Sequence, residues 1–259
     1  MFIDTHAHLY DEQFKDDFAA MLLMSQEQGV EKIFMPNCDL TTLQPMLAIA
    51  SKHPRNCFPM LGLHPCYVKE DVEEVLEVMQ EQLSSDISFS AIGEIGLDYY
   101  WDVTYRNEQI DAFKTQCQWA LDKNIWVDIH CRKAYADIIS ILSQKEFSQL
   151  TGIIHCFSGD ASEATRLTQL GYSLGIGGVI TYKNTNLFES IKHIDLKYLV
   201  LETDSPYLTP VPFRGKPNHP QYLKLIAQKL ADLFEVQVDE IIKITTENAL
   251  KFKAFSNFQ

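Results

Sequence analysis

The sequence predicts an α/β fold, a single (β/α)8 TIM barrel with a metal site at the C-terminal ends of the strands. Three observations lead to this prediction. Eight short apolar, β-branched runs recur along the 259 residues, a segment of helical periodicity follows each run, and ligand-type side chains stand at the ends of several runs. Such alternation implies parallel strands with right-handed crossovers, and eight such units can close into a barrel. An open doubly wound sheet is the alternative.

The predicted strands are bounded by polar residues or by glycine and proline. They cover residues 1–8, 32–37, 58–63, 89–95, 126–131, 152–157, 172–177 and 198–203. The helix candidates cover residues 16–28, 41–53, 71–83, 107–123, 135–144, 161–171, 185–194, 221–234 and 239–252. In a barrel of this kind, reactive side chains belong at the carboxyl ends of the strands, where the loops converge.

The length and the 46% content of hydrophobic residues suit either one large barrel or two ordinary domains. No internal repeat, low-complexity tract or linker interrupts the alternation of strands and helices. The dense proline and glycine stretch at residues 206–220 falls where the loop after the eighth strand belongs. We therefore expect one domain over residues 1–259.

The net charge of -13 argues against broad electrostatic attraction to nucleic acid or to anionic membranes. The N-terminus shows no basic segment, long apolar stretch or small-residue cleavage site, so we expect a cytoplasmic protein without membrane association. The six cysteines include no Cys-x-x-Cys pair, and we expect them to be reduced, buried, apolar side chains.

The first predicted strand carries two histidines two residues apart. Alternate side chains of a strand share a face, so Asp4, His6 and His8 are expected to point toward the barrel axis together. Phe2 is expected to continue that face at the base of the barrel. For one histidine alone, a hydrogen-bonded core role is the alternative. Two neutral imidazoles side by side in an apolar barrel need a partner, however, and a metal ion supplies one.

Predicted strands four, five and six each end with a further ligand-type side chain, in Glu94, His130 and His155. A buried glutamate is costly unless it is paired, and an ion pair with an arginine is the alternative to ligation. The two oxygens of Glu94 can instead bridge two cations held about 3.5 to 4 Å apart. Asp98 suits a loop or helix N-cap role better and is left out of the metal set.

Predicted strand eight ends with two carboxylates, Glu202 and Asp204, on a common face. Adjacent carboxylates repel each other unless cations or protons separate them. Asp204 lies nearer the mouth, where it can both ligate a metal and accept a proton from a metal-bound water. Glu202 lies one layer deeper and can orient a ligand. The alternative is that Asp204 or Ser205 caps a short helix before Pro206.

Four side chains are candidates for contacting a phosphate substrate. His64, on a proline-stiffened turn, can contact substrate, act as an acid or be structural. Arg132 shares the predicted inward parity of His130 and is either a phosphate contact or a structural ion pair. Arg214 and Lys216 fall in the loop after strand eight, which is either a phosphate-binding loop or a solvated one.

Seven motifs stand in order along the chain. They are Asp4-Thr-His-Ala-His8, Leu61-Gly-Leu-His-Pro65, Gly93-Glu-Ile-Gly-Leu-Asp98, Ile129-His-Cys-Arg132, His155-Cys-Phe-Ser-Gly159, Glu202-Thr-Asp-Ser-Pro-Tyr-Leu208 and Pro212-Phe-Arg-Gly-Lys216. On these motifs the sequence resembles, nearly end to end, the TatD family of metal-dependent deoxyribonucleases, within the metallo-dependent hydrolase superfamily of (β/α)8 barrels. One departure is Lys133, where members of that family often carry an aspartate; it spares every candidate ligand.

The resemblance implies two divalent metal ions, which would be magnesium, manganese or zinc, and cleavage of phosphodiester bonds in DNA, usually as an exonuclease. It assigns His6, His8, Glu94 and Asp204 to one metal site. It assigns Glu94, His130 and His155 to a second site, with Glu94 as the bridge. The expected substrate is a DNA end or single-stranded DNA, because an acidic protein attracts phosphates only locally, through its metal ions. No obligate protein partner is expected.

Two other functions remain open at this level. The first is a hydrolase of the same superfamily that acts on a small phosphate ester, lactone or amide. Many of its members bridge their metals with a modified lysine from strand four, and Glu94 holds that place here, which favours the nuclease-like branch. The second is a scaffold that binds metal without turnover, which the completeness of the six ligands disfavours.

Overall fold

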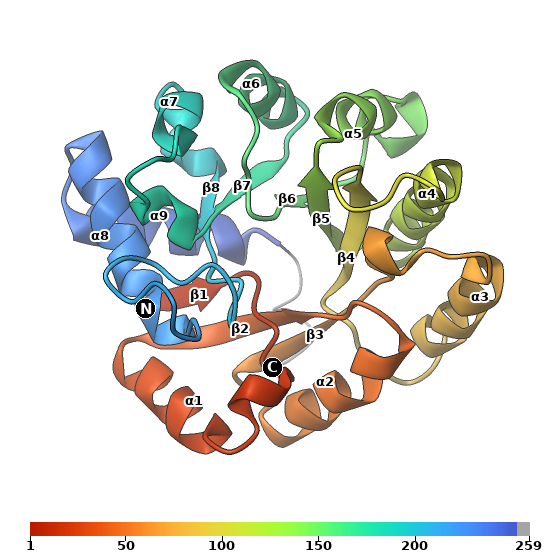
Figure 1. Ribbon diagram of the computed structural model, residues 1–259, viewed down its shortest axis with the longest axis horizontal. Helices are drawn as coiled ribbons and strands as arrows, with labels where there is room; N and C mark the ends of the chain where they lie inside the picture. Colours follow the sequence, from red (N-terminus) through yellow and green to blue (C-terminus); the bar gives the residue numbers. More distant parts are fainter. Residues whose placement is uncertain (253–259) are drawn as a thin grey trace.

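The computed structural model describes residues 1–252, which form an eight-stranded parallel sheet in the order of the sequence (Figure 1). The strands are β1 (Phe2–Asp4), β2 (Val30–Pro36), β3 (Cys57–Leu61), β4 (Ala91–Asp98), β5 (Trp126–Arg132), β6 (Gly152–Ile154), β7 (Ser173–Ile176) and β8 (Leu199–Leu201). Beyond the end of β1, the Thr5 amide donates to the Leu201 carbonyl, and Ala7 forms a parallel bridge with Ser205. These contacts join the first and last strands, so the predicted barrel is confirmed and the open sheet is excluded.

Helices surround the strands on the outside of the barrel (Figure 1). They are α1 (Phe18–Glu27), α2 (Leu40–Lys52), α3 (Val72–Leu83), α4 (Arg106–Lys123), α5 (Tyr135–Leu142), α6 (Ala161–Gln169), α7 (Leu187–Ile191), α8 (Leu223–Phe234) and α9 (Val238–Leu250). Helices α1 to α8 each follow the strand of the same number. Local signals explain several of their ends: Asp39 and Asp160 form capping boxes at the starts of α2 and α6. Asn124 ends α4 in the left-handed conformation.

Two apolar clusters hold the barrel together. A smaller cluster fills the barrel interior and includes Ile3, Phe34, Phe58, Met60, Ala91, Trp126, Ile153 and Val200. Ala249 and Phe252 belong to the same cluster, with the Phe252 and Trp126 ring centroids 4.9 Å apart. The C-terminal end of α9 therefore packs against the base of the barrel, opposite the carboxyl ends of the strands. A larger cluster lies between the strands and the surrounding helices.

The inward parity that we predicted for Phe2 is wrong. Phe2 packs in the larger, outer cluster, and Ile3 packs in the barrel interior. The physical reason is that β1 pairs with β2 through a register shift between Phe2 and Ile3, and the strand ends at Asp4. His6 and His8 therefore lie in the irregular segment after the strand, and alternation along residues 1–8 does not describe them.

All six cysteines are free thiols, as predicted, but not all are buried. Cys57, Cys117 and Cys131 are buried in the core, whereas Cys38, Cys66 and Cys156 are half-buried. Cys38 and Cys66 line the pocket described below. Among residues 1–252, no helix is both long enough and apolar enough to cross a membrane.

Candidate metal centre

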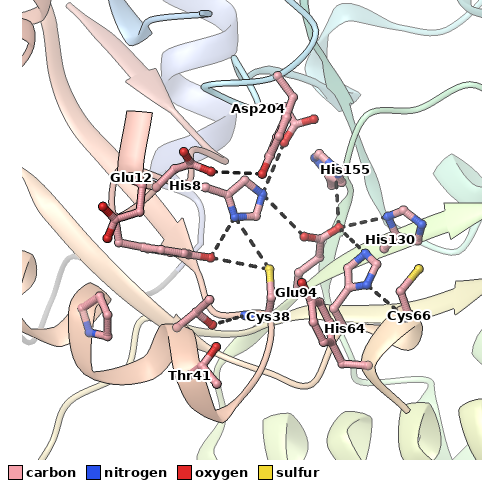
Figure 2. A pocket seen from close by; sticks show the side chains of 16 residues that line it. His8, Glu12, Cys38, Thr41, His64, Cys66, Glu94, His130, His155 and Asp204 are labelled. Atoms are coloured by element: carbon pink, nitrogen blue, oxygen red, sulfur yellow. Dashed lines mark hydrogen bonds and ion pairs between the residues drawn. The ribbon is translucent and has the colours of Figure 1, made fainter. Parts of the chain in front are cut away.

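The carboxyl ends of the strands surround an open pocket of about 590 Å³. Figure 2 shows the ligand-type side chains that point into this pocket, which are His8, Glu94, His130, His155 and Asp204. His6 lies beneath them and is fully buried. The structure thus brings together all six candidate ligands, although the chain spreads them from position 6 to position 204.

His6 and His8 face each other through their Nε2 atoms, which lie 3.1 Å apart. His6 Nδ1 lies 2.7 Å from Asp128 Oδ2, and His8 Nδ1 lies 2.8 Å from the Tyr10 hydroxyl oxygen. Because the Tyr10 hydroxyl donates its proton to the Pro36 carbonyl, its oxygen accepts from His8 Nδ1–H. When Asp128 is ionised, both Nε2 atoms direct a lone pair at the same point. A cation at that point removes the repulsion.

The carboxylate of Glu94 divides its two oxygens between two groups of imidazoles. Oε2 lies 3.5 Å from His6 Nε2 and 3.8 Å from His8 Nε2. Oε1 lies 3.0 Å from His130 Nδ1 and 3.7 Å from His155 Nε2. The histidines hold the pKa of this carboxyl well below its usual range, although its burial alone would raise it. Glu94 is thus an ionised carboxylate in position to bridge two cations.

His130 and His155 are each supported by a carboxylate behind the ring. His130 Nε2 lies 2.9 Å from Asp98 Oδ2 in a hydrogen bond, and His155 Nδ1 lies 3.0 Å from Glu202 Oε1 in an ion-pair contact that lacks hydrogen-bond geometry. In both rings the opposite nitrogen faces Glu94. A carboxylate behind a ligating histidine fixes its orientation and raises its basicity, and all four candidate imidazole ligands have a carboxylate or a phenol oxygen in that position.

Asp204 completes the first group of donors. Its Oδ1 lies 3.4 Å from His8 Nε2 and 3.6 Å from His6 Nε2. Asp204 adopts a left-handed backbone conformation with φ of 55°, which is uncommon for a residue other than glycine and is typical of functional sites. The segment that follows is a turn rather than a helix, so the alternative that Asp204 or Ser205 caps a helix is wrong.

Glu202 lies deeper than Asp204 and is fully buried. Besides its contact with His155, its Oε1 accepts the Cys156 amide at 2.6 Å. A Cβ atom on Gly175 would lie 2.1 Å from Glu202 Oε2, so the missing side chain at position 175 makes room for this carboxylate. The predicted role of Glu202 in orienting a ligand stays a prediction.

The donor set fits divalent cations. Imidazole and carboxylate together suit zinc, manganese and related ions. Among the described residues, donor atoms lie within 4.8 Å of one another in four groups, which are His6, His8 and Glu94; His6, His155 and Asp204; His64, Glu94 and His130; and His155, Cys156 and Glu202. Burial raises the pKa of Asp128 well above its usual range, so this carboxyl needs a nearby positive charge to stay ionised. Asp128 Oδ1 and Glu202 Oε2 are buried with no hydrogen-bond partner in the described chain, which also indicates a site designed around added positive charge.

His64 lies in the same pocket but turns its protonated nitrogen toward Glu94. It precedes the 3-10 turn Pro65–Tyr67, and its Nδ1 accepts the Cys66 amide at 3.1 Å. A neutral imidazole that accepts at Nδ1 carries its proton on Nε2, which lies 3.4 Å from Glu94 Oε1. Burial lowers the pKa of His64, so the ring is neutral near pH 7. His64 therefore presents a proton donor to the pocket instead of a lone pair.

The three predicted phosphate-binding cations do not line the pocket. Arg132, although its predicted parity was inward, is exposed, and its guanidinium stacks over Tyr100 at 4.0 Å from the ring centroid. Arg214 stacks over Tyr182 at 4.1 Å, and Lys216 is exposed. No ion pair holds Arg132 within residues 1–252, so the structural ion pair considered for it is absent from this part of the chain. All three remain candidates for substrate outside the pocket.

The supporting roles of Asp128 and Tyr10 were not predicted from the sequence. Asp128 is fully buried in the middle of β5, two residues before His130, and a carboxylate inside an apolar run was the available signal. Tyr10 carried no comparable signal. Asp98 plays the predicted loop role, because its Oδ1 accepts the Tyr100 amide at 2.8 Å. Its second contact, with His130, was not foreseen.

Comparisons with known proteins place the chain in one family. A family model described as TatD related DNase matches residues 3–253. The chain is 37% identical over 250 residues to the uncharacterized metal-dependent hydrolase YabD of Bacillus subtilis, with 96% of this chain and 97% of that protein covered. It is 36% identical over 259 residues to an uncharacterized metal-dependent hydrolase of Haemophilus influenzae, with 96% and 97% covered.

Solved structures give the same result. The crystal structure of YjjV, a TatD homologue from Escherichia coli K12, superimposes with a TM-score of 0.89 at 31% identity, over 96% of each chain. A β-aspartyl dipeptidase from Fervidobacterium islandicum shares the fold, with a TM-score of 0.65 at 14% identity. The match covers 97% of this chain and 74% of the dipeptidase chain. The chain belongs to the TatD family and is a metal-dependent hydrolase built on a TIM barrel.

Proposed function

We propose that this protein is a phosphodiesterase that cleaves DNA with two divalent metal ions and acts as an exonuclease on DNA ends or single strands. The observation that carries this proposal is the division of the Glu94 oxygens between two imidazole groups. Two cations bridged by one carboxylate are typical of enzymes that displace groups at phosphorus, because such a pair matches the oxygens on both sides of the reacting phosphate.

His6, His8, Glu94 and Asp204 would hold one cation, and Glu94, His130 and His155 would hold the other. When bound, such cations supply a nucleophile at neutral pH and neutralise the charge that develops on the phosphate. The chain itself supplies orientation: Asp128, Tyr10, Asp98 and Glu202 fix the four rings from behind.

Two side chains are placed to move protons. Asp204 lines the pocket with its carboxylate and would accept a proton from the attacking water. His64 carries its proton on Nε2, facing the pocket, and would donate a hydrogen bond to the phosphate or to the leaving oxygen. An acceptor that follows β8 and a donor that follows β3 can thus serve attack and departure in turn.

The net charge of the protein favours a substrate that contacts it through few phosphates. With a net charge of -13, the surface as a whole repels an extended duplex, and attraction is local, chiefly at the metal-rich pocket. A strand end needs few phosphate contacts, so binding should depend only weakly on salt. A steep loss of affinity with added salt, equivalent to many phosphate contacts, would contradict this part of the proposal.

The test measures cleavage of a 5′-labelled single-stranded DNA oligonucleotide in the presence of magnesium, manganese or zinc. A reaction that contains a chelator in place of metal is the comparison. Glu94→Ala should abolish cleavage, while Glu77→Ala, which removes an exposed carboxylate from α3, should not. Asp204→Asn keeps the shape of the side chain and should lower turnover by about 100-fold or more. Circular dichroism of each variant separates loss of activity from loss of fold.

A regular ladder of products that requires metal and Glu94 supports the proposal and gives the polarity of digestion. Bound metal by elemental analysis without cleavage of DNA under any of the three ions would overturn it. Screening of small phosphate esters, lactones and amides would then identify the hydrolase activity, and the absence of all turnover would leave a metal-binding scaffold.

A further inference from the structure

The loop between β4 and α4 places two aromatic rings in solvent at the rim of the pocket. Tyr100 is 47% exposed and Trp101 is 69% exposed. Their rings meet edge to face, with centroids 4.9 Å apart and planes at 85°. A tryptophan this exposed leaves a large apolar face in water, which is typical of a binding surface.

Two cations from the end of β5 lie over the same rings. The Arg132 guanidinium is 4.0 Å from the Tyr100 centroid and 5.2 Å from the Trp101 centroid, and Lys133 Nζ is 4.9 Å from Tyr100. Neither cation forms an ion pair within the described 252 residues, although the chain as a whole is strongly acidic. We call Tyr100, Trp101, Arg132 and Lys133 the rim platform.

The exposure of these rings is not the result of a loose loop. The Tyr99 amide donates to the Arg132 carbonyl at 2.9 Å, and the Tyr99 hydroxyl donates to Asp137 at 2.7 Å. At the other end of the loop, the Tyr105 hydroxyl donates to Glu70 at 2.7 Å. One end of the loop is therefore anchored to β5 and α5 and the other to the segment before α3, and the rings lie between these anchors.

The rim platform is tied directly to the metal centre through Asp98. One oxygen of Asp98 lies 2.9 Å from His130 Nε2, and the other accepts the amides of Tyr100 and Trp101 at 2.8 and 3.3 Å. Cys66 lines both the metal pocket and a smaller cavity of about 130 Å³ that Trp101 also lines. A chain of nucleotides with one phosphate in the pocket can thus reach the platform.

From this arrangement we infer that the rim platform binds an unpaired nucleobase by stacking, with Arg132 and Lys133 contacting the adjacent phosphates. This inference rests on the proposed function and narrows its substrate to single-stranded DNA or frayed ends. Inside a duplex each base is stacked on both sides and has no free face, whereas an unpaired base can stack on an aromatic ring. A small ester or lactone substrate gives no reason for exposed rings and unpaired cations together.

The fluorescence of Trp101 can report binding at the rim platform. The other tryptophans, Trp119 and Trp126, are only 5% and 2% exposed, so a stacking base should quench the fluorescence of Trp101 selectively. The titration uses the whole protein in chelator, where no cleavage occurs, with a ten-nucleotide thymidine strand, an abasic strand of the same length, and a blunt duplex. We expect the abasic strand and the duplex to bind about 5- to 100-fold more weakly than the thymidine strand.

Trp101→Ala should lose the fluorescence change and weaken binding of the thymidine strand by a similar factor, measured by anisotropy of a labelled strand. Val103→Ala removes another exposed apolar side chain of the same loop, at 57% exposure, and should bind as the wild type does. Arg132→Ala should keep the quenching and reduce the salt dependence of binding by about one phosphate contact. Equal affinity for thymidine and abasic strands, or unchanged binding by Trp101→Ala, overturns the inference.

The two proposals fail in different ways. If the wild-type protein cleaves DNA with metal and Trp101→Ala has the same KM, the phosphodiesterase stands and the rim platform is wrong. If the thymidine strand binds selectively through Trp101 but no metal supports cleavage, the platform stands and the proposed reaction is wrong.

Discussion

Asp128 Oδ2 lies 2.7 Å from His6 Nδ1, although 122 positions separate the two residues. Asp128 lies in β5 and His6 follows β1, and these two strands are not neighbours in the sheet. The contact crosses the inside of the barrel beneath the metal pocket, where both side chains are fully buried. It fixes the ring of His6 so that Nε2 points at His8 and Glu94. A residue that supports a candidate metal ligand from behind thus comes from the opposite side of the barrel.

Asp128→Asn should weaken metal binding about 10- to 100-fold while leaving the fold intact, because the amide keeps the shape but loses the charge that orients and polarises His6. Isothermal titration calorimetry with manganese or zinc measures the change. Asp122→Asn, an exposed substitution at the end of α4, is the matched control. Unchanged affinity in Asp128→Asn would show that the contact is structural only.

Gly175→Ala should displace Glu202, since the added Cβ would lie 2.1 Å from its Oε2. We expect a loss of about 1–3 kcal/mol in the free energy of unfolding, as for other overpacked cores, together with weaker metal binding. Denaturant unfolding and elemental analysis measure the two effects. Gly177→Ala is the control, because its nearest contact would be an ordinary 3.6 Å. Equal effects of both substitutions would argue against a specific role of the space at position 175.

Metal binding should release protons. The Glu202 and Glu94 carboxylates raise the pKa of His155 well above its usual value, although burial alone would lower it. In the same way, Asp98 and Glu94 raise the pKa of His130. In the metal-free protein these rings keep a proton to higher pH, and a metal binds only the unprotonated ring. Metal affinity should therefore fall as the pH is lowered through the histidine range.

Calorimetry in two buffers that differ in ionisation enthalpy counts the protons released. Bound metal should also raise the midpoint of thermal unfolding, by mass action, and a chelator should reverse that shift. Glu94→Gln is the control variant, in which the thermal shift should be small. Affinity that does not change between pH 6 and pH 8 would contradict the role of protonated histidines.

The six candidate ligands were predictable because each stands after an apolar run, and barrel topology gathers the carboxyl ends of all strands. Orientation was less predictable. Alternation failed for Phe2, because the register shift in β1 reverses the face, and it failed for Arg132, which stacks on rings of a neighbouring loop. Asp128 and Tyr10 act through partners that no local pattern identifies. The roles of the six ligands stay predictions until metal is measured.

His64 and His130 lie at the same pocket with ring centroids 4.4 Å apart, and both rings carry their proton on Nε2. They turn opposite nitrogens toward Glu94, which gives them different roles. His64 Nδ1 accepts a backbone amide, so its Nε2 carries a proton and offers no lone pair to a metal. His64→Phe should therefore leave the metal content unchanged and lower kcat by about 10- to 1,000-fold, as expected for loss of one donor to the reacting phosphate. His130→Phe should lose metal from the second site. Elemental analysis measures the metal content of both variants, and their rates of DNA cleavage are compared in parallel. Loss of metal from His64→Phe would mean that the proton of His64 moves off Nε2 when metal binds and that His64 is a ligand.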